Sequence, residues 1–281
     1  MSNTFNIVHL QQGSPEWHEW RHKGIGASDA RAAMAKPGKS RAKLLAEKRA
    51  SEPPDDSFTT VAMDIGTELE PEARRLYNER HQANVRPVCV QSDRYPWLRA
   101  SLDGLSDDGQ LVVEIKCGAW VHQQASKRFP VQYKAQVQHI LAVTGLPSLD
   151  FWCYWPWSPD PEILLSVPRD EAYIKRLLVA EQKFWDEVLS DKNPIGEFLD
   201  LPVLDPAMDD EEGSEAEFSD LQATISMAGL SGLTELNLSN KQLTALPPEI
   251  GNLTRLTGLD LGDNQLTALP PEIGNLTGLT R

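Results

Sequence analysis

The sequence of 281 residues predicts an α/β protein, in which helices flank a central mixed β-sheet and a short repeat segment follows. Three observations favour this fold class. Helix-capping signals and amphipathic patterns alternate with short apolar runs between residues 14 and 190. A turn signal, Asp107-Asp108-Gly109, joins two of those runs as a hairpin. Over residues 229–281, the chain repeats itself with a 23-residue period.

Residues 14–50 are predicted to be helical. Ser14-Pro15-Glu16 is typical of a helix cap and first turn, and Ser28-Asp29 opens a second helix. Arg41 to Ala50 forms a third helix, which the two prolines at 53 and 54 end. A long amphipathic helix then covers Val61 to Gln82, because its apolar residues recur at helical spacing.

The remaining elements of this part follow in order. Short strands are predicted near 85–91 and 97–101, and then comes the hairpin that carries Asp103 and Glu114. After the hairpin we expect a helix over Pro130–Thr144, two paired strands over Leu149–Pro156 and Glu162–Val167, and a closing helix over Pro168–Ser190.

The C-terminal segment consists of repeats. Leu233 to Leu253 is echoed by Leu256 to Leu276, and a third copy begins at Leu279, which is the pattern of leucine-rich repeats. Such arrays usually need about three copies for independent stability. The segment is interpreted either as a binding surface or as a dispensable appended tail. The expected division is a first domain over 1–205, an acidic linker over 206–228 and the repeats over 229–281.

Composition restricts the cellular compartment and the class of metal or disulfide site that we expect. The three cysteines, Cys89, Cys117 and Cys153, are scattered and lack C-x-x-C spacing, so neither a disulfide framework nor a cysteine-bound metal is expected. His122 and His139 are interpreted as structural, because neither has a second ligand at metal spacing. The sequence shows no signal pattern and no membrane-spanning segment, so a cytoplasmic protein is expected.

The net charge of −14 is unevenly distributed. Residues 206–281 hold 12 acidic and 3 basic residues, whereas Arg21 to Arg49 carries nine lysines and arginines against two acidic residues. Because distant charges are screened beyond roughly 8 Å in physiological salt, this local basic patch can bind phosphate on an acidic protein. For Lys36 to Arg49, a solvated helix face is the alternative.

One constellation carries chemistry. Glu114 and Lys116 are two apart in an apolar strand and therefore share a face, and the hairpin brings Asp103 alongside Glu114. Two carboxylates can hold a hard divalent cation, which activates water for attack on a phosphodiester. The lysine adds a point charge, or orients or deprotonates that water. The alternative is an ion pair at a sheet edge beside a turn aspartate.

These residues lie within a set of motifs that resembles a known family. Residues 13–190 resemble the YqaJ-like viral recombinases and lambda-type alkaline exonucleases, which are restriction-endonuclease-like nucleases with a D…(D/E)xK core. The motifs are Trp17-His18-Glu19-Trp20-Arg21, Gly24-Ile25-Gly26-Ala27-Ser28, Gly66, Glu70-Pro71-Glu72-Ala73-Arg74, Asp103-Gly104-Leu105, Glu114-Ile115-Lys116-Cys117, and Tyr133 with Gln136-Val137-Gln138.

The resemblance implies roles for the residues of the constellation. Asp103 and Glu114 resemble the metal ligands, with the carbonyl oxygen of Ile115 as a third. Lys116 resembles the catalytic lysine. Glu70 resembles a helix glutamate that reaches the metal directly or through water. Leu102 stands where many relatives have proline, which puts the turn before Asp103 in doubt.

The resemblance also implies a substrate-binding set. Gln136 and Tyr133 resemble residues that brace the nucleophile and the scissile phosphate. Arg21 and Ser28 resemble the pocket for a terminal 5′-phosphate, which a guanidinium fork and a helix N-terminus both suit. His22-Lys23 precedes Gly24, which offsets this pocket relative to the family pattern.

Each assignment has an alternative interpretation. Glu70 also suits an exposed i,i+4 pair with Arg74, and Gln136 suits a surface amide. Trp17 and Trp20 are interpreted as core residues that pack within the fold, not as residues that stack on bases.

The implied function is a Mg²⁺-dependent 5′→3′ exonuclease on double-stranded DNA, with Mn²⁺ as a possible substitute. Its substrate would be duplex with 5′-phosphate ends, and a single-strand annealing protein would receive the 3′ single strands during phage-type recombination. Relatives of the lambda type form a ring-shaped homotrimer, so the resemblance implies a homotrimer here.

Two other functions remain open. The first is a nuclease of the same core with another activity, such as a structure-specific or nicking endonuclease or a single-strand exonuclease of CRISPR adaptation. The latter often needs four cysteines for an iron–sulfur cluster, and this chain has three. The second is a leucine-rich adaptor whose nuclease-like domain is inactive.

Overall fold

The computed structural model describes residues 5–35, 39–53, 61–190, 234–238, 243 and 245–280. The acidic linker expected over 206–228 lies outside these residues, as does the stretch from 191 to 205.

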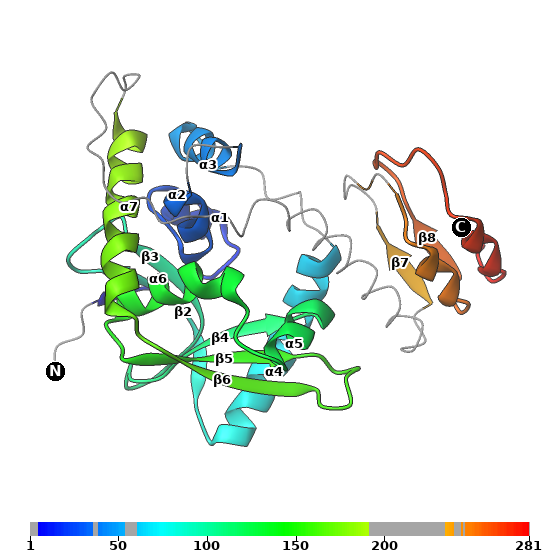
Figure 1. Ribbon diagram of the computed structural model, residues 1–281, viewed down its shortest axis with the longest axis horizontal. Helices are drawn as coiled ribbons and strands as arrows, with labels where there is room; N and C mark the ends of the chain where they lie inside the picture. The colour runs from blue at the N-terminus through cyan, green and yellow to red at the C-terminus, as the bar shows by residue number, and fades with distance from the viewer. Residues whose placement is uncertain are drawn as a thin grey trace.

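The first 190 residues are built around a mixed six-stranded sheet, which confirms the predicted fold class (Figure 1). The strands lie side by side in the order in which they occur along the chain. Only β4 and β5 are parallel neighbours, and the other pairs are antiparallel. The strands are β1 Phe5–Val8, β2 Val85–Ser92, β3 Arg99–Ser106, β4 Val112–Cys117, β5 Ser148–Tyr154 and β6 Glu162–Pro168.

The predicted hairpin joins β3 to β4. Gly109 has a φ of +68°, which glycine adopts without the steric cost that a side chain would add. Gly104 pairs with Val113 and Leu105 with Val112. Continuing this register by one residue places Asp103 across from Glu114.

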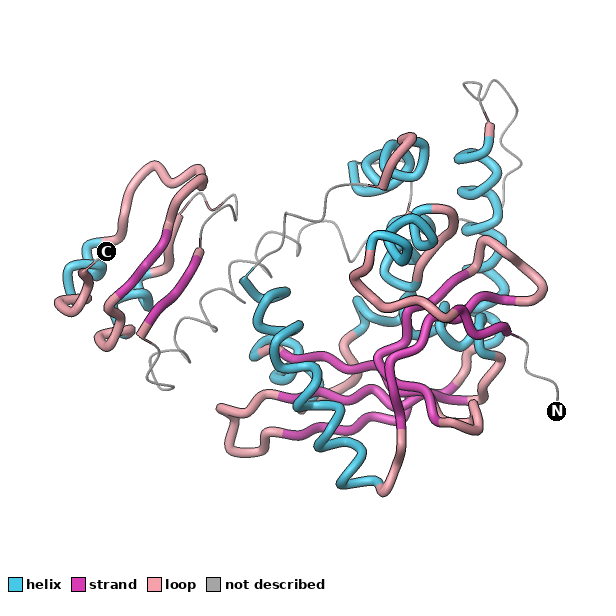
Figure 2. Tube along the Cα trace, turned by 180° about the vertical axis from the view of Figure 1, so that it is seen from behind, coloured by secondary structure: helices cyan, strands magenta, loops and turns pink. Residues whose placement is uncertain are grey.

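Helices cover both faces of the sheet (Figure 2). On one side, α6 and α7 pack together and α2 packs against both, while α4 lies across the other side. The helices are α1 Pro15–His22, α2 Ala30–Met34, α3 Lys39–Arg49, α4 Val61–His81, α5 Ala119–Ala125, α6 Lys134–Thr144 and α7 Glu171–Leu189.

The two faces of the sheet bury separate apolar clusters. Alternate residues of a strand point to opposite faces, and β4 shows this clearly. Val112 packs in the cluster that includes Ile140 of α6 and Phe184 of α7. Val113 packs instead in the cluster formed with α4. Glu114 and Lys116 share the parity of Val112, so they project toward the side of α6.

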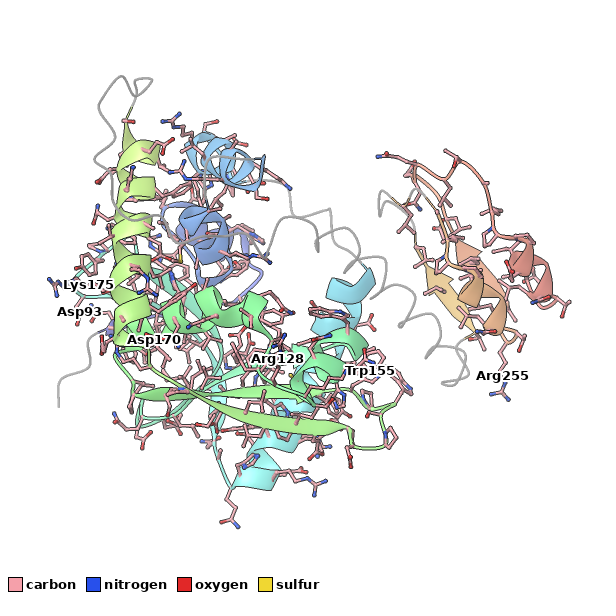
Figure 3. The ribbon with its side chains drawn as sticks, viewed as in Figure 1. Asp93, Arg128, Trp155, Asp170, Lys175 and Arg255 are labelled. Atoms are coloured by element: carbon pink, nitrogen blue, oxygen red, sulfur yellow. The ribbon has the colours of Figure 1, made fainter. Side chains whose placement is uncertain are left out.

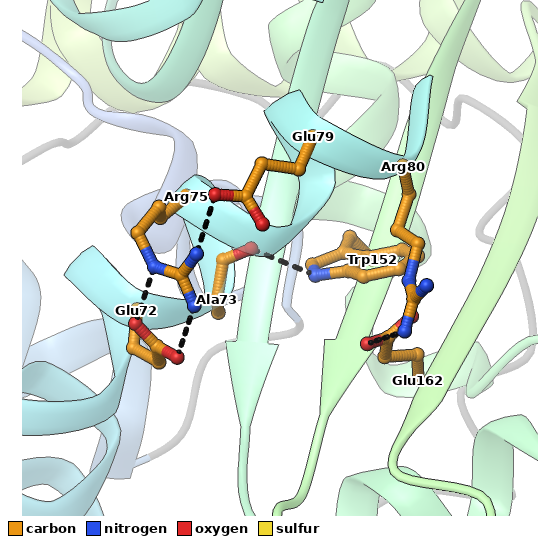
Figure 4. A network of polar contacts seen from close by, with 7 residues as sticks. All are labelled: Glu72, Ala73, Arg75, Glu79, Arg80, Trp152 and Glu162. Atoms are coloured by element: carbon orange, nitrogen blue, oxygen red, sulfur yellow. Dashed lines mark hydrogen bonds and ion pairs between the residues drawn. The ribbon is translucent and has the colours of Figure 1, made fainter. Parts of the chain in front are cut away.

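Helix α4 is attached to its face of the sheet by hydrogen bonds and by an exposed ion pair (Figure 4). Trp152 of β5 donates its indole N–H to the Ala73 carbonyl at 3.1 Å. Arg80 pairs with Glu162 of β6 at 2.9 Å, and Arg75 bridges two glutamates of the helix. Because exposed ion pairs contribute only about 0–1 kcal/mol each, apolar burial carries most of this packing.

The structure differs from the sequence-based expectations at several elements. Strand β1 and helix α5 were not expected. Ser28-Asp29 lies in a 3₁₀ turn, Ala27–Asp29, that leads into α2, and a second 3₁₀ turn, Val131–Tyr133, precedes α6. Helix α7 begins at Glu171 and not at Pro168, because Pro168 pairs with Ser148 in the sheet. Asp170 then caps the helix by accepting from the Tyr173 amide (Figure 3).

The repeats form a small unit of their own. Strands β7 Glu235–Asn237 and β8 Gly258–Asp260 are parallel, and each pair of partners is 23 residues apart, which matches the repeat period. Each strand is followed by a 3₁₀ helix, Pro248–Asn252 and Pro271–Asn275. The buried side chains of this unit are Leu238, Leu246, Ile250, Leu253, Leu256 and Leu276.

Two further expectations concern chemistry and location. All three cysteines are free thiols, as predicted. Among the described helices, none is both long and apolar enough to cross a bilayer.

Candidate active site

Most of the predicted catalytic residues and both predicted phosphate-binding residues line one pocket of about 200 Å³, which Glu70 and Tyr133 do not line. Four of its residues belong to the predicted catalytic set, namely Asp103, Glu114, Lys116 and Gln136. Arg21 and Ser28 border the same pocket from α1 and the 3₁₀ turn that follows it. Its remaining lining residues are Gln12, Trp17, Trp20, Gly26, Ala27, Arg99, Ala100 and Ser101.

Glu114 is the buried carboxylate of the pocket, with only 2% of its surface exposed. Its Oε1 lies 2.5 Å from the Lys116 ammonium and accepts a 2.5 Å hydrogen bond from the Gln136 amide. Burial, together with the nearby Asp103 carboxylate, raises the pKa of Glu114 to about 7. A further cation that approaches Glu114 would therefore stabilise the ionised form of its carboxyl group.

Lys116 carries the positive charge of the pocket. Burial alone would lower the pKa of Lys116, but the carboxylates of Glu114 and Asp103 outweigh it and raise that pKa above its ordinary value. The ammonium also lies 5.6 Å from the centre of the Tyr133 ring. Lys116 is therefore protonated at neutral pH, which favours a role as a charged donor over one as a base.

Asp103 is attached to the opposite strand through its side chain. Its Oδ2 accepts the Ile115 amide N–H at 2.8 Å, and its own carbonyl accepts from Arg74 Nε at 2.6 Å. These two bonds hold the carboxylate at the edge of the β3–β4 hairpin, despite Leu102 in place of proline. Asp103 and Glu114 therefore converge on one pocket, as the hairpin predicted.

Glu70 and Arg74 form the i,i+4 pair that the alternative interpretation of Glu70 describes. Glu70 lies on α4 and does not line the pocket, yet it is close enough to interact with the pocket charges. Burial and the Asp103 carboxylate raise the pKa of Glu70, while Arg74 and Lys116 oppose that rise. Its role as a metal-site glutamate stays a prediction.

Gln136 and Tyr133 are brought to the same side of the pocket by the start of α6. Gln136 binds Glu114 directly, which excludes the alternative of a surface amide. Tyr133 stacks obliquely on Phe151, with ring centres 5.5 Å apart, and contacts Lys116. Their predicted roles at the scissile phosphate remain predictions.

Arg21 and Ser28 form the other end of the pocket. Arg21 Nη2 donates to Ser28 Oγ at 2.5 Å, and its guanidinium lies 5.0 Å from the centre of the Trp17 ring. Partly buried Asp29 accepts the Gly26 amide at 3.0 Å and pairs with Lys48 at 2.8 Å, so the loop that carries Ser28 is firmly attached. This arrangement presents one guanidinium and one hydroxyl to the pocket.

Sequence reasoning assigned no role to Ser101 and Arg99, which border the pocket. Ser101 and Arg99 precede Asp103 on β3 at two-residue spacing, so all three belong on one face of the strand, and that period was the available signal. Trp17 donates its indole N–H to Ser101 Oγ at 2.8 Å. Trp17 is buried, as the core interpretation expects, but it also lines the pocket, as does Trp20.

The donor set suits a hard divalent cation only in part. Among the described residues, no three His, Cys, Asp or Glu side chains form a metal-binding group. Asp103 and Glu114 instead offer two carboxylates, and Mg²⁺ commonly uses one or two carboxylates together with water and substrate phosphate. Burial and then the Asp103 carboxylate raise the pKa of Glu114, and a divalent cation would offset both effects by stabilising the ionised form.

Two segments of the chain match models of known families. Residues 16–147 match the family model for the YqaJ-like viral recombinase domain, and residues 231–278 match leucine-rich repeats in two copies. The chain is similar to the crystal structure of an alkaline exonuclease, LHK-Exo, from Laribacter hongkongensis, with 28% identity and a TM-score of 0.56. The structure of LHK-Exo in complex with dAMP is similar to the chain with 29% identity and a TM-score of 0.57. Both comparisons cover 62% of this chain and 92% of the exonuclease. No protein with a curated description matches.

Proposed function

We propose that this chain is a metal-dependent deoxyribonuclease that digests double-stranded DNA from its 5′ ends, because residues 16–147 match the family model for the YqaJ-like viral recombinase domain. The similarity to alkaline exonuclease structures supports an exonuclease of the phage type. The finer proposal is that Mg²⁺ is the metal, with Mn²⁺ as a substitute.

One observation carries this proposal more than any other. The Arg21–Ser28 end and the Glu114–Lys116 end belong to a single pocket of about 200 Å³. A phosphate bound by Arg21 and Ser28 would therefore lie in the same small pocket as the residues that would act on a phosphodiester. That arrangement suits an enzyme that cleaves the phosphodiester next to a bound strand terminus.

The residues of the pocket divide the chemistry among them. A divalent cation held by Asp103 and Glu114 would supply an activated water and neutralise phosphate charge. Lys116 would present its ammonium to the charge that develops on the phosphate in the transition state. Gln136 would hold Glu114 in place and orient the attacking water.

The wider proposal concerns assembly and domains. We take residues 1–205 as the nuclease domain, 206–228 as an acidic linker and 229–281 as the repeats. A homotrimer and delivery of 3′ single strands to an annealing protein are supported by resemblance to the family alone. The repeats would offer an additional binding surface.

Digestion of matched linear and circular duplexes tests the activity. We expect a 5′-phosphorylated linear duplex to be degraded in Mg²⁺ and the covalently closed circle of the same sequence to survive. Addition of EDTA should stop the reaction, because the two carboxylates alone cannot activate water. Gel analysis of both substrates over time is the measurement.

Each other outcome of this assay has a meaning. Cutting of the circle would favour an endonuclease with the same core. Full activity in EDTA would contradict the metal requirement. Failure to digest either substrate at any Mg²⁺ or Mn²⁺ concentration would favour the inactive adaptor.

Replacing Arg21 with glutamine tests the phosphate end. We expect the preference for a 5′-phosphorylated over a 5′-hydroxyl end to fall about tenfold or more, because a charge-assisted hydrogen bond to phosphate is lost. The maximal rate at saturating substrate should change less than KM. An unchanged preference would remove Arg21 from the phosphate-binding set. Lys23→Gln is the matched control, because Lys23 is a neighbouring, largely exposed cation outside this pocket.

A further inference from the structure

Arg99 is a guanidinium of the pocket to which neither the family motifs nor the predicted site assigns a role. It opens β3, and its side chain donates to two backbone carbonyls, to Trp20 O and to Pro96 O, the latter at 3.1 Å. The guanidinium carbon lies 5.3 Å from the centre of the Trp20 ring. Arg99 and Trp20 both line the pocket that holds Glu114 and Lys116.

The backbone of Arg99 is attached on both sides. Its amide donates to Ile25 O at 3.0 Å, and its carbonyl accepts from buried His139 at 2.8 Å. Gly24 packs so closely that a Cβ there would come within 2.7 Å of the Arg99 side chain. The position of this guanidinium is therefore set by the fold and not by free rotation in solvent.

The charge of Arg99 has no acidic counterpart among the described residues. Two other partly buried arginines have one, since Arg41 pairs with Glu187 and Arg74 with Glu70. A partly buried charge without an opposite charge nearby costs more free energy than a paired one. Burial lowers the pKa of Arg99 to about 10, so it remains protonated at neutral pH. An anion that enters the pocket would supply the missing counter-charge.

Arg99 also repeats the arrangement of Arg21. Helix α1 presents Trp17 and Trp20, and one guanidinium lies over each indole, with Arg21 5.0 Å from the Trp17 ring centre. All four side chains line the pocket. The lining of the pocket thus contains two guanidinium groups together with the ammonium of Lys116.

We propose that Arg99 is a second phosphate-binding guanidinium, which acts with Arg21 to select a terminal phosphomonoester over an internal phosphodiester. The inference rests on the proposed function and deepens it. A terminal monoester carries nearly two negative charges at neutral pH, because its second pKa is about 6, whereas an internal diester carries one. Two cations at the binding end favour the doubly charged group, and so favour attack from strand ends.

The contrasting role for Arg99 is purely structural. Its bond to Trp20 O lies in the last turn of α1, where a cation stabilises the helix end. That role predicts that loss of Arg99 lowers stability and slows all substrates alike. The proposal predicts instead a selective loss on phosphorylated ends.

The experiment compares kcat and KM of the full chain on two linear duplexes that differ only in a 5′-phosphate or a 5′-hydroxyl. For Arg99→Gln, we expect the 5′-phosphate preference in kcat/KM to fall roughly tenfold, mainly through KM. Arg99→Lys should keep part of the preference, because it keeps the charge without the planar fork. Arg94→Gln is the matched control, since Arg94 is an exposed arginine over Tyr95 outside the pocket.

Three outcomes decide the question. A selective loss in Arg99→Gln, with wild-type behaviour in Arg94→Gln, supports the proposal. An unchanged preference in Arg99→Gln overturns it, and so does an equal loss on both duplexes with a lower melting temperature. If Arg99→Gln does not fold, the 5′-phosphate preference in kcat/KM is compared between Arg99→Lys and the wild type. A reduced preference supports the proposal, and an unchanged preference overturns it.

A binding assay separates this proposal from the proposed function. If the wild-type chain digests neither duplex, the proposed function fails, and the pocket is then tested with 5′-dAMP and with deoxyadenosine by tryptophan fluorescence. Selective binding of 5′-dAMP that weakens roughly tenfold in Arg99→Gln supports the phosphate role. Equal binding by both proteins, or no discrimination by the wild type, overturns it.

Discussion

Replacing Lys116 with alanine is expected to abolish hydrolysis while DNA binding is retained. The ammonium lies 2.5 Å from Glu114 Oε1, inside the pocket, and the two carboxylates keep it charged. Loss of one positioned donor to the charge that develops in a transition state costs about 10²–10³ in rate. Lys116 also neutralises Glu114, so a larger loss is expected. Single-turnover digestion of a 5′-phosphorylated duplex measures the rate, and fluorescence anisotropy without catalytic metal measures binding.

Lys127→Ala is the matched control for this prediction, because Lys127 is an exposed lysine outside the pocket. It should digest DNA at the wild-type rate. Removal of Lys116 leaves Glu114 buried without its cation, so the melting temperature of Lys116→Ala must be recorded at the assay pH. A folded Lys116→Ala protein that digests DNA at the wild-type rate would show that the active site lies elsewhere.

The core of the site was predictable because it depends on local rules. Two-residue spacing placed Glu114 and Lys116 on one face of a strand, and a three-residue turn signal fixed the partner strand. Together these rules bring Asp103 across from Glu114. Both patterns involve residues at most thirteen positions apart, which is the range over which periodicity and turn chemistry are informative.

The contacts of the pocket across the fold were not predictable in the same way. Gln136 reaches Glu114 from α6, and Arg99 lies against Trp20, which is 79 residues earlier. Such pairs depend on how helices pack on the sheet, and no local pattern encodes that packing. The family motifs pointed to Gln136 but not to Arg99.

Two elements escaped the sequence analysis for identifiable reasons. Helix α5 spans only seven residues and is preceded by Gly118 as its N-cap, which supplies no side-chain cap. Strand β1 spans four residues and buries only Phe5 fully, so its apolar pattern is too short to detect. Strand β1 lies at the edge of the sheet, and all of its residues pair with β2.

A buried ion pair behind the pocket is expected to control the pH dependence of stability. His139 and Glu181 are both fully buried, and the His139 Nδ1 lies 2.7 Å from Glu181 Oε1. The other ring nitrogen faces the Arg99 carbonyl at 2.8 Å. When Glu181 is ionised, both neighbours are acceptors, so both ring nitrogens carry protons and the imidazole is cationic. Burial alone would lower the pKa of His139, but Glu181 raises it above its ordinary value, with a smaller contribution from Asp29.

The free energy of unfolding should therefore fall as pH rises through the raised pKa of His139. A group with a raised pKa contributes its full stabilisation below its unfolded pKa, about 6.5 for histidine, and loses it above the folded value. His139→Ala should cost about 3–5 kcal/mol near pH 6, because it leaves Glu181 buried without a partner. Glu181→Gln should flatten the pH dependence, because a neutral partner no longer favours the imidazolium. Urea unfolding from pH 6 to 9 measures these effects, with Glu171→Gln, an exposed carboxylate on the same helix, as control. Parallel pH profiles for the wild type and Glu181→Gln would show that His139 is neutral in the folded protein.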